Sequence, residues 1–146
     1  MQRVTLPNEV LLSEVGRLLQ AGETVTMKVK GNSMLPFITG ERDSVVLRRA
    51  GKLRQGDIVL AKLENGEYVL HRIVALNAHR ITLMGDGNLC GTEQCPRTAI
   101  AGQAIRILRR GKTIKCTSPT QRRRAALWKA LLPVRRYLLA IYKRIA

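Results

Sequence analysis

The sequence predicts a mainly β protein of the α+β class: a partly closed, barrel-like core with a short helix before it and an amphipathic helix after it. Three observations predict this. Seven short strand-like segments follow one another, turns that contain glycine separate them, and no helices alternate with them as in a βαβ protein. With 146 residues, 45% of them hydrophobic, the chain is long enough to bury one core.

The first predicted element is a helix near the N-terminus. Pro7 suits the first turn of a helix, and Asn8 or Glu9 favours its start. Apolar residues then recur at helical spacing until Gly22. We therefore expect a helix over about residues 7–21.

The core that follows is predicted to consist of strands. Alternating apolar residues mark the first strand, and the pair Asn65-Gly66 is a strong signal for a two-residue hairpin turn. The segment Leu89–Arg97 is the least regular part of the core, and no strand is predicted there. The predicted strands are Thr24–Lys30, Ser44–Arg48, Asp57–Leu63, Tyr68–Leu76, Arg80–Met84, Ala99–Leu108 and Thr113–Cys116.

The C-terminal segment, residues 121–146, differs from the core in composition. It holds eight basic residues and no acidic one, half of the net charge of +16. On a helix its apolar and basic residues would gather on opposite faces, and Pro133 should kink or split that helix. Ser118-Pro119-Thr120 is the expected linker and N-cap. We divide the chain into a core domain, 1–117 (helix about 7–21, strands about 24–116), and a basic helical tail, 118–146. The predicted apolar face is Leu127, Leu131, Val134, Leu138, Ile141, Tyr142 and Ile145.

Such a tail suits an anionic partner. A helix with basic residues on one face and Leu, Trp and Tyr on the other can lie in the interface of an anionic membrane. The alternative is a helix that packs against its own core or against a partner protein. No recognition motif supports binding to a specific nucleic acid, although charge alone permits contact. The candidate membrane-binding residues are Arg122, Arg123, Arg124, Trp128, Lys129, Arg135, Arg136, Lys143 and Arg144.

We expect a membrane-associated protein on the cytoplasmic face, with no signal peptide and no transmembrane span. Polar residues follow the first seven, and no apolar run approaches the roughly 18 residues that a span needs. Cys90, Cys95 and Cys116 are an odd number, which favours reduced thiols. The spacing of Cys90 and Cys95 does not match a zinc ribbon, so no metal or other cofactor is expected.

Three short segments carry candidate chemistry. Ser33 lies in a tight turn, Gly31–Pro36, directly after a predicted strand. His71 interrupts an otherwise apolar strand, and Asp86 lies in the glycine-containing turn Gly85–Asn88. Each has a plain structural alternative: a surface loop, a hydrogen-bonded histidine, or an aspartate that caps its own turn.

Together with two strand segments, these motifs resemble the type I signal peptidases and the related self-cleaving repressors of the LexA type. The resemblance covers about residues 24–110 and implies the signal peptidase catalytic core. Most bacterial members have a lysine where His71 stands, so this sequence is similar to the histidine type, and His71 argues against LexA-type self-cleavage. The matching segments, in family order, are Gly31–Pro36 (nucleophile), Gly40–Val46 and Gly56–Val59 (strands), His71–Val74 (general base) and Gly85–Asn88 (terminal turn).

The resemblance implies a serine endopeptidase. Ser33 would be the nucleophile and His71 the general base, and Asp86 would bind the other ring nitrogen of His71. The backbone N–H of Ser33 would stabilise the oxyanion. Many relatives add a hydroxyl two residues before the nucleophile, where this sequence has Gly31, and the Asn32 side chain is the candidate second donor.

The implied substrate is a peptide or preprotein that binds as an added strand. Shallow pockets for small residues would be lined by Met34, Ile58 and Leu70. The alternative is a catalytically silent, membrane-associated binding or regulatory module of the same fold, which only Gly31 favours. The presence of the serine, the histidine and the aspartate together favours the peptidase.

Overall fold

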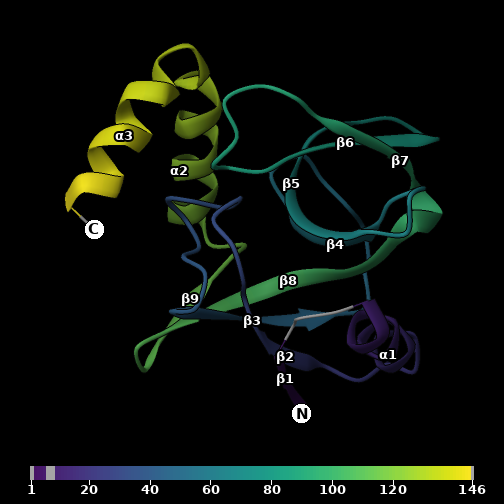
Figure 1. Cartoon of the computed structure of the whole chain (residues 1–146). Helices are drawn as coiled ribbons and strands as arrows, with labels where there is room; N and C mark the ends of the chain where they lie inside the picture. Colours follow the sequence, from purple (N-terminus) through teal and green to yellow (C-terminus); the bar gives the residue numbers. More distant parts are fainter. Residues whose placement is uncertain (1, 6–8, 146) are drawn as a thin grey trace.

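The computed structural model describes the backbone of residues 2–5 and 9–145, and the side chains of residues 12–145. Within these residues nine strands form one sheet, in the order β1-β2-β3-β8-β4-β5-β6-β7, with β9 paired to β8 (Figure 1). Every pair is antiparallel except β1–β2. The sheet curls strongly, but β1 and β7 stand at its two ends and it does not close. The predicted mainly β class is confirmed.

The element bounds are close to the predicted ones. All seven predicted strands are present. The helix predicted over about residues 7–21 is α1, which ends at Gln20; residues 7 and 8 lie outside the described part of the chain. The strands are β1 (Gln2–Thr5), β2 (Val25–Lys28), β3 (Asp43–Arg48), β4 (Ile58–Lys62), β5 (Tyr68–Leu76), β6 (Arg80–Met84), β7 (Glu93–Pro96), β8 (Ile100–Arg109) and β9 (Lys112–Lys115). The helices are α1 (Glu9–Gln20), α2 (Pro119–Ala130) and α3 (Arg135–Ile145), with short 3₁₀ turns at Arg97–Ala99 and Leu132–Val134.

Two strands, β1 and β7, were not predicted from the sequence. The residues of β7, Glu-Gln-Cys-Pro, include no β-branched or aromatic side chain, and Pro96 is a poor strand residue. Pairing with β6 holds this segment extended, with Glu93 opposite Leu83. The strand is therefore a product of tertiary pairing and not of local propensity.

Two apolar clusters fill the two sides of the curl. The first lies between α1 and the sheet, where Val15 and Leu19 are completely or almost completely buried. A side chain at Gly102 would come within 2.6 Å of Leu19, so this glycine allows α1 to lie close to β8. The second cluster fills the curl of β4 to β7. Its buried members are Val59, Ala61, Ile73, Ile81, Leu83, Cys95 and Ile100.

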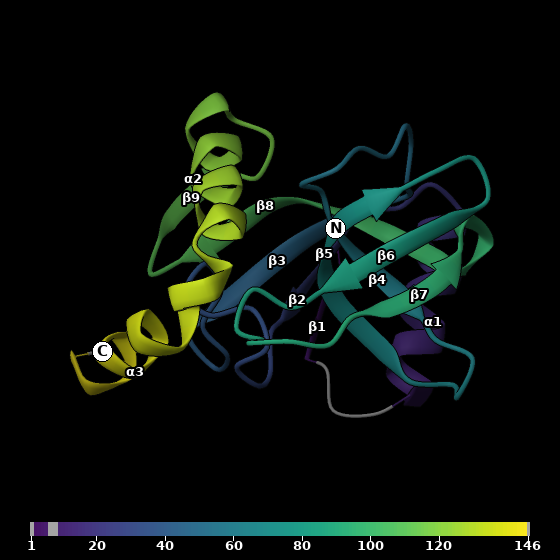
Figure 2. The same ribbon diagram turned by 90° about the horizontal axis from the view of Figure 1, so that it is seen from above.

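The C-terminal helices lie at the end of the sheet away from α1, as both views show (Figures 1 and 2). Ser118 caps α2 by accepting a hydrogen bond from the backbone N–H of Gln121, as predicted, and Pro133 lies in the 3₁₀ turn that separates α2 from α3. Because the helix is split, the predicted single apolar face does not form. Leu131, Leu138 and Tyr142 pack on a third cluster around Leu35, Trp128 and Leu139, whereas Leu127, Val134, Ile141 and Ile145 are exposed.

A buried carboxylate closes the long loop between β2 and β3. Asp43 accepts hydrogen bonds from the backbone N–H of Thr39 at 2.8 Å, from Arg42 at 2.8 Å and from Arg109 at 3.2 Å. Arg109 also donates to the carbonyl oxygen of Phe37 at 2.6 Å. Burial alone would raise the pKa of Asp43, but these hydrogen bonds outweigh it and hold the pKa below its ordinary value.

We expect Asp43→Asn to lower the free energy of unfolding by about 3 kcal/mol, because two arginines lose a charged acceptor. A depressed native pKa stabilises the fold above the unfolded-state value of about 3.9, and this contribution disappears as the pH falls through the lower native pKa. The difference between the two proteins should therefore be constant near neutral pH and shrink below about pH 4. Urea unfolding across a pH series measures it. The exposed change Glu64→Gln is the control, and an equal effect of both substitutions would contradict this role of Asp43.

Candidate active site

The exposed Ser33 lies in a turn that is fixed at its neck. Glu41 donates its backbone N–H to the carbonyl oxygen of Val29 at 2.8 Å, which draws the two ends of the loop together. Gly31 has φ +79°, a conformation that favours glycine, and a side chain at Gly40 would come within 2.7 Å of the Gly31 nitrogen. Gly31 and Gly40 thus allow the tight turn that places Ser33 at the surface.

The donors predicted for an oxyanion are available in this turn. The backbone N–H of Ser33 makes no backbone hydrogen bond within the described part of the chain. The carbonyl oxygen of Asn32 accepts a hydrogen bond from Leu35 at 3.2 Å, which tightens the turn, while Asn32 itself is exposed. The backbone N–H of Ser33 and the side-chain amide of Asn32 can therefore donate to a ligand at the surface.

The turn after β6 brings Ser33 next to His71. Gly87 donates its backbone N–H to the carbonyl oxygen of Ser33 at 2.8 Å, and a side chain at Gly87 would lie 2.5 Å from the carbonyl oxygen of Asn32. A side chain at Gly85 would collide with the Ser33 carbonyl oxygen and lie 3.1 Å from Nε2 of His71. The predicted nucleophile and the predicted base therefore flank one glycine. The Ser33 hydroxyl and His71 share no hydrogen bond here, a contact that often tightens only when substrate binds.

The other nitrogen of His71 contacts a carboxylate that sequence reasoning missed. His71 is 7% exposed on β5, and its Nδ1 lies 2.5 Å from Oε1 of Glu93. This contact orients the ring so that Nε2 faces the Ser33 turn, and it favours the proton on Nδ1. Glu93 lies in β7, one of the two strands that were not predicted, so the signal in the sequence was only a carboxylate in an irregular segment.

The predicted hydrogen bond between His71 and Asp86 is not present, which corrects that prediction. Asp86 instead accepts two hydrogen bonds from Arg72, at 2.8 and 2.7 Å, and both residues are buried. His71 and Arg72 are neighbours on β5, so their side chains point to opposite faces of the sheet. Asp86 lies on the Arg72 side and therefore cannot serve the histidine.

Two of the three predicted cleft residues also prove to be structural. Met34 and Ile58 are 2% and 3% exposed and belong to the buried cluster beneath α1. They cannot line an open substrate pocket. Leu70 is half-buried and packs against the same cluster. Met34 also supports the turn, since its sulfur lies 3.5 Å from the backbone nitrogen of Asp86.

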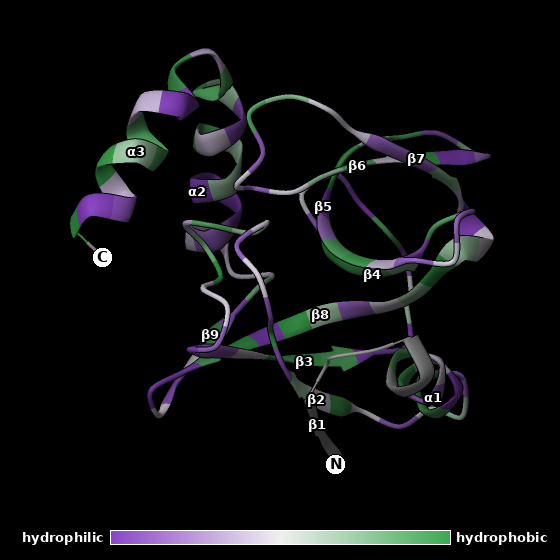
Figure 3. Ribbon diagram, in the orientation of Figure 1, coloured by the Kyte–Doolittle hydropathy of each residue, from purple (hydrophilic) through white to green (hydrophobic). Residues whose placement is uncertain are grey.

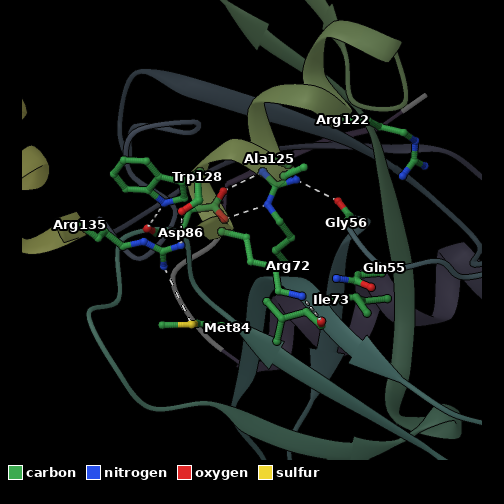
Figure 4. Close-up of a pocket in the computed structure, with 13 residues that line it drawn as sticks. Gln55, Gly56, Arg72, Ile73, Met84, Asp86, Arg122, Ala125, Trp128 and Arg135 are labelled. Carbon is green, nitrogen blue, oxygen red and sulfur yellow. Dashed lines mark hydrogen bonds and ion pairs between the residues drawn. The ribbon is translucent and has the colours of Figure 1, made fainter. Parts of the chain in front are cut away.

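The C-terminal helices contact the same turn (Figure 4). Trp128 donates its indole N–H to the carbonyl oxygen of Asp86 at 2.7 Å. Arg135 stacks on the Trp128 ring at 4.9 Å and donates to the carbonyl oxygen of Asn88 at 3.0 Å. Two more of the predicted membrane-binding residues contact the core. Arg122 pairs with Asp57 at 2.8 Å, and Lys129 donates to the carbonyl oxygen of Val74 at 3.1 Å. The other five are exposed: Arg123, Arg124, Arg136, Lys143 and Arg144.

The three cysteines are unpaired. Cys90 is exposed, Cys95 is buried and Cys116 is half-buried. Burial raises the pKa of Cys116 to about 11 and also raises that of Cys95, so both remain protonated thiols near neutral pH. Over the described residues, no group of three or more His, Cys, Asp or Glu side chains is arranged to hold a metal ion.

The structure thus places an exposed serine turn beside a histidine–carboxylate pair on a curled, mainly antiparallel sheet. The chain matches the family model described as Peptidase S24-like over residues 2–107, and it belongs to this family, within the LexA and signal peptidase superfamily. The family implies a hydrolase of the serine peptidase type. Among curated proteins, none matches significantly. The matched region contains Ser33, His71 and Glu93 and ends before the C-terminal helices.

We expect Asp86→Asn and Glu93→Gln to separate a structural carboxylate from a site carboxylate. Asp86→Asn leaves the buried Arg72 without its charge partner and should lower the free energy of unfolding by about 3–5 kcal/mol. Glu93 is 28% exposed, so Glu93→Gln should cost about 1 kcal/mol or less. Urea unfolding of the two variants measures this, and a larger loss for Glu93→Gln would overturn the assignment.

Proposed function

We propose that the protein is a serine endopeptidase of the signal peptidase type in its histidine variant. One observation carries this proposal: His71 stands between the Glu93 carboxylate at Nδ1 and the Ser33 turn at Nε2. A serine hydroxyl is a poor nucleophile near neutral pH and needs a base within reach. An exposed serine turn next to an oriented imidazole supplies that pair.

The proposed reaction follows from these positions. His71 Nε2 takes the proton of the Ser33 hydroxyl as its oxygen attacks the scissile carbonyl carbon. The tetrahedral oxyanion accepts a hydrogen bond from the backbone N–H of Ser33, and the Asn32 side chain is the second candidate donor. His71 then protonates the leaving amine. Water, deprotonated by the same nitrogen, hydrolyses the acyl-enzyme and restores the serine.

Glu93 is the proposed positioning residue. Its carboxylate accepts the Nδ1 proton, holds the ring in the tautomer that leaves Nε2 free, and stabilises the imidazolium formed during attack. This role replaces the one that the sequence suggested for Asp86. The proposed substrate, an extended peptide or preprotein, rests on the resemblance to signal peptidases. The second candidate, a silent binding module, is favoured by Gly31, which leaves no hydroxyl donor at that position.

We expect Ser33→Ala and His71→Ala each to remove nearly all cleavage, and the double variant to lose little more than either single one. Glu93→Gln should lower kcat about 10²–10⁴-fold with a smaller change in KM, because it disturbs the tautomer and not binding. A diverse peptide library with mass-spectrometric detection of products measures cleavage.

The exposed change Glu64→Gln is the matched control and should cleave as the parent does. Products that persist in Ser33→Ala would overturn the mechanism. Empty profiles for the parent and all variants, with and without anionic vesicles, would favour the silent binding module.

We further propose that α3 lies on the anionic membrane surface of the cytoplasmic leaflet. Four residues at helical spacing form an exposed apolar stripe on and just before this helix: Val134 (44% exposed), Tyr137 (65%), Ile141 (57%) and Ile145 (79%). Basic residues are interspersed with them, so apolar and polar bands alternate along α3 (Figure 3). Within the described residues, no helix is long and apolar enough to cross a membrane. Surface binding through α3 is the mode that this pattern supports.

We expect Ile141→Asp to weaken binding to phosphatidylglycerol vesicles about tenfold or more, because it places a charge in the middle of the apolar stripe. Ala130→Asp makes the same charge change on an exposed position of α2 and is the matched control. Vesicle sedimentation over a salt series measures both. Equal losses would mean that net charge alone drives binding and would contradict the role of the stripe.

A further inference from the structure

A cavity of about 260 Å³ lies between α2 and the sheet, on the opposite side of β5 from the His71 face (Figure 4). We call it the α2 cavity. Its wall includes strand residues, the β6 turn and the inward face of α2. The residues used below are Arg72, Asp86, Arg122, Ala126, Trp128, Lys129 and Arg135.

The charges in this wall do not balance. Four cations line the cavity, and Asp86 is the one carboxylate among its lining residues. Asp86 pairs with Arg72, and Asp57, next to the cavity, pairs with Arg122. Lys129 and Arg135 have no carboxylate within ion-pair distance in the described part of the chain. Two positive charges are therefore left over, which suits a ligand with two negative charges.

Hydrogen-bonding groups are also left over. The Nε donors of Arg122 and Arg135 are both buried and lack a partner among the described residues. Arg135 is 4% exposed, and burial lowers its pKa, an effect that the nearby Asp86 offsets only in part. A buried donor without an acceptor costs free energy, so a ligand acceptor that reaches either Nε would remove that cost.

Much of the remaining lining is apolar. Val74, Met84, Ala125 and the indole of Trp128 contribute to the wall, together with Gln55 and Gly56 and beside the charged groups. An inorganic anion alone would leave this apolar part of the lining exposed to water. A ligand with an anionic head and a compact apolar body uses both parts of the cavity.

We propose that the α2 cavity binds a phosphate monoester with a compact apolar substituent. Such an ester is largely doubly charged near neutral pH, because its second pKa is about 6. Its oxygens match guanidinium donors, and Lys129 contributes a movable ammonium at the rim. Asp86 lines the cavity, and the preceding Gly85 packs against the Ser33 carbonyl oxygen and His71, so an occupant would contact the turn that separates Ser33 from His71.

Phenyl phosphate is a suitable probe, and Trp128, the one tryptophan of the chain, reports on the cavity. Titration of the full chain at constant ionic strength, with excitation at the red edge of the indole band, should give a saturable single-site change in fluorescence. Inorganic phosphate and benzoate should bind at least several-fold more weakly, because each lacks either the apolar body or the second charge.

Two variants test the location. Ala126→Leu fills an exposed edge of the cavity without a change in charge and should abolish the response, whereas Ala130→Leu, on α2 outside the lining, should not. Lys129→Gln should weaken binding about tenfold. Arg136→Gln, an equal charge change on exposed α3, should leave it unchanged. Equal effects within either matched pair, or equal affinity for all three anions, would overturn the proposal and indicate non-specific binding to a basic protein.

Vesicles that contain phosphatidic acid identify the source of the phosphate. If Ala126→Leu removes a fluorescence response to these vesicles as well, the cavity accepts a lipid headgroup. If it removes only the response to phenyl phosphate, the ligand is a soluble ester. None of these measurements uses cleavage, so the outcome is independent of the proposed peptidase activity.

Discussion

The buried ion pair between Arg72 and Asp86 is the constraint on which the rest of the site depends. Arg72 donates twice to the carboxylate and once more to the carbonyl oxygen of Gly56 at 2.9 Å, and its guanidinium lies 4.8 Å from the centre of the Phe37 ring. The pair thereby joins β5, the turn after β6 and the loop that carries the predicted nucleophile. Two charges buried in this way are stable only while both are present. Trp128 adds the C-terminal helix to the same junction through the carbonyl oxygen of Asp86.

Because side chains alternate along β5, its two neighbouring polar residues bind two different carboxylates. His71 and Arg72 are adjacent, so one points toward the exposed serine turn and the other toward α2. Each has its own acid, Glu93 for the histidine and Asp86 for the arginine. Because the two pairs lie on opposite sides of one strand, neither carboxylate shares its hydrogen bonds with the other. Asp86, which the sequence suggested as the partner of His71, lies on the Arg72 face instead.

Much of the fold was predictable from the sequence, because apolar residues alternate within the core strands and turn-forming residues separate these strands. The seven strands and the helix around Val15 follow from that local signal. Glu93 was not predictable, since β7 exists only through pairing with β6 and its residues have no strand preference. Met34 was misjudged for a related reason: a residue next to an exposed serine can still point into the core, and the sequence does not record that direction. The glycines Gly85 and Gly87 were placed correctly in a turn, but only the packed structure shows that a side chain there would displace Ser33.

The C-terminal segment combines features of the two alternatives that its sequence left open. Buried Arg135 and half-buried Arg122 hold the helices on the core, while Arg136 and its exposed neighbours on α3 remain at the surface. The consequence concerns the site itself. Because Trp128 and Arg135 fasten the turn that ends at Asn88, the helices are part of the scaffold that positions Ser33 and not a detachable anchor. Trp128, through the Asp86 carbonyl oxygen, and Arg135, through that of Asn88, therefore join α2 and the start of α3 to the turn whose Gly87 donates to the carbonyl oxygen of Ser33.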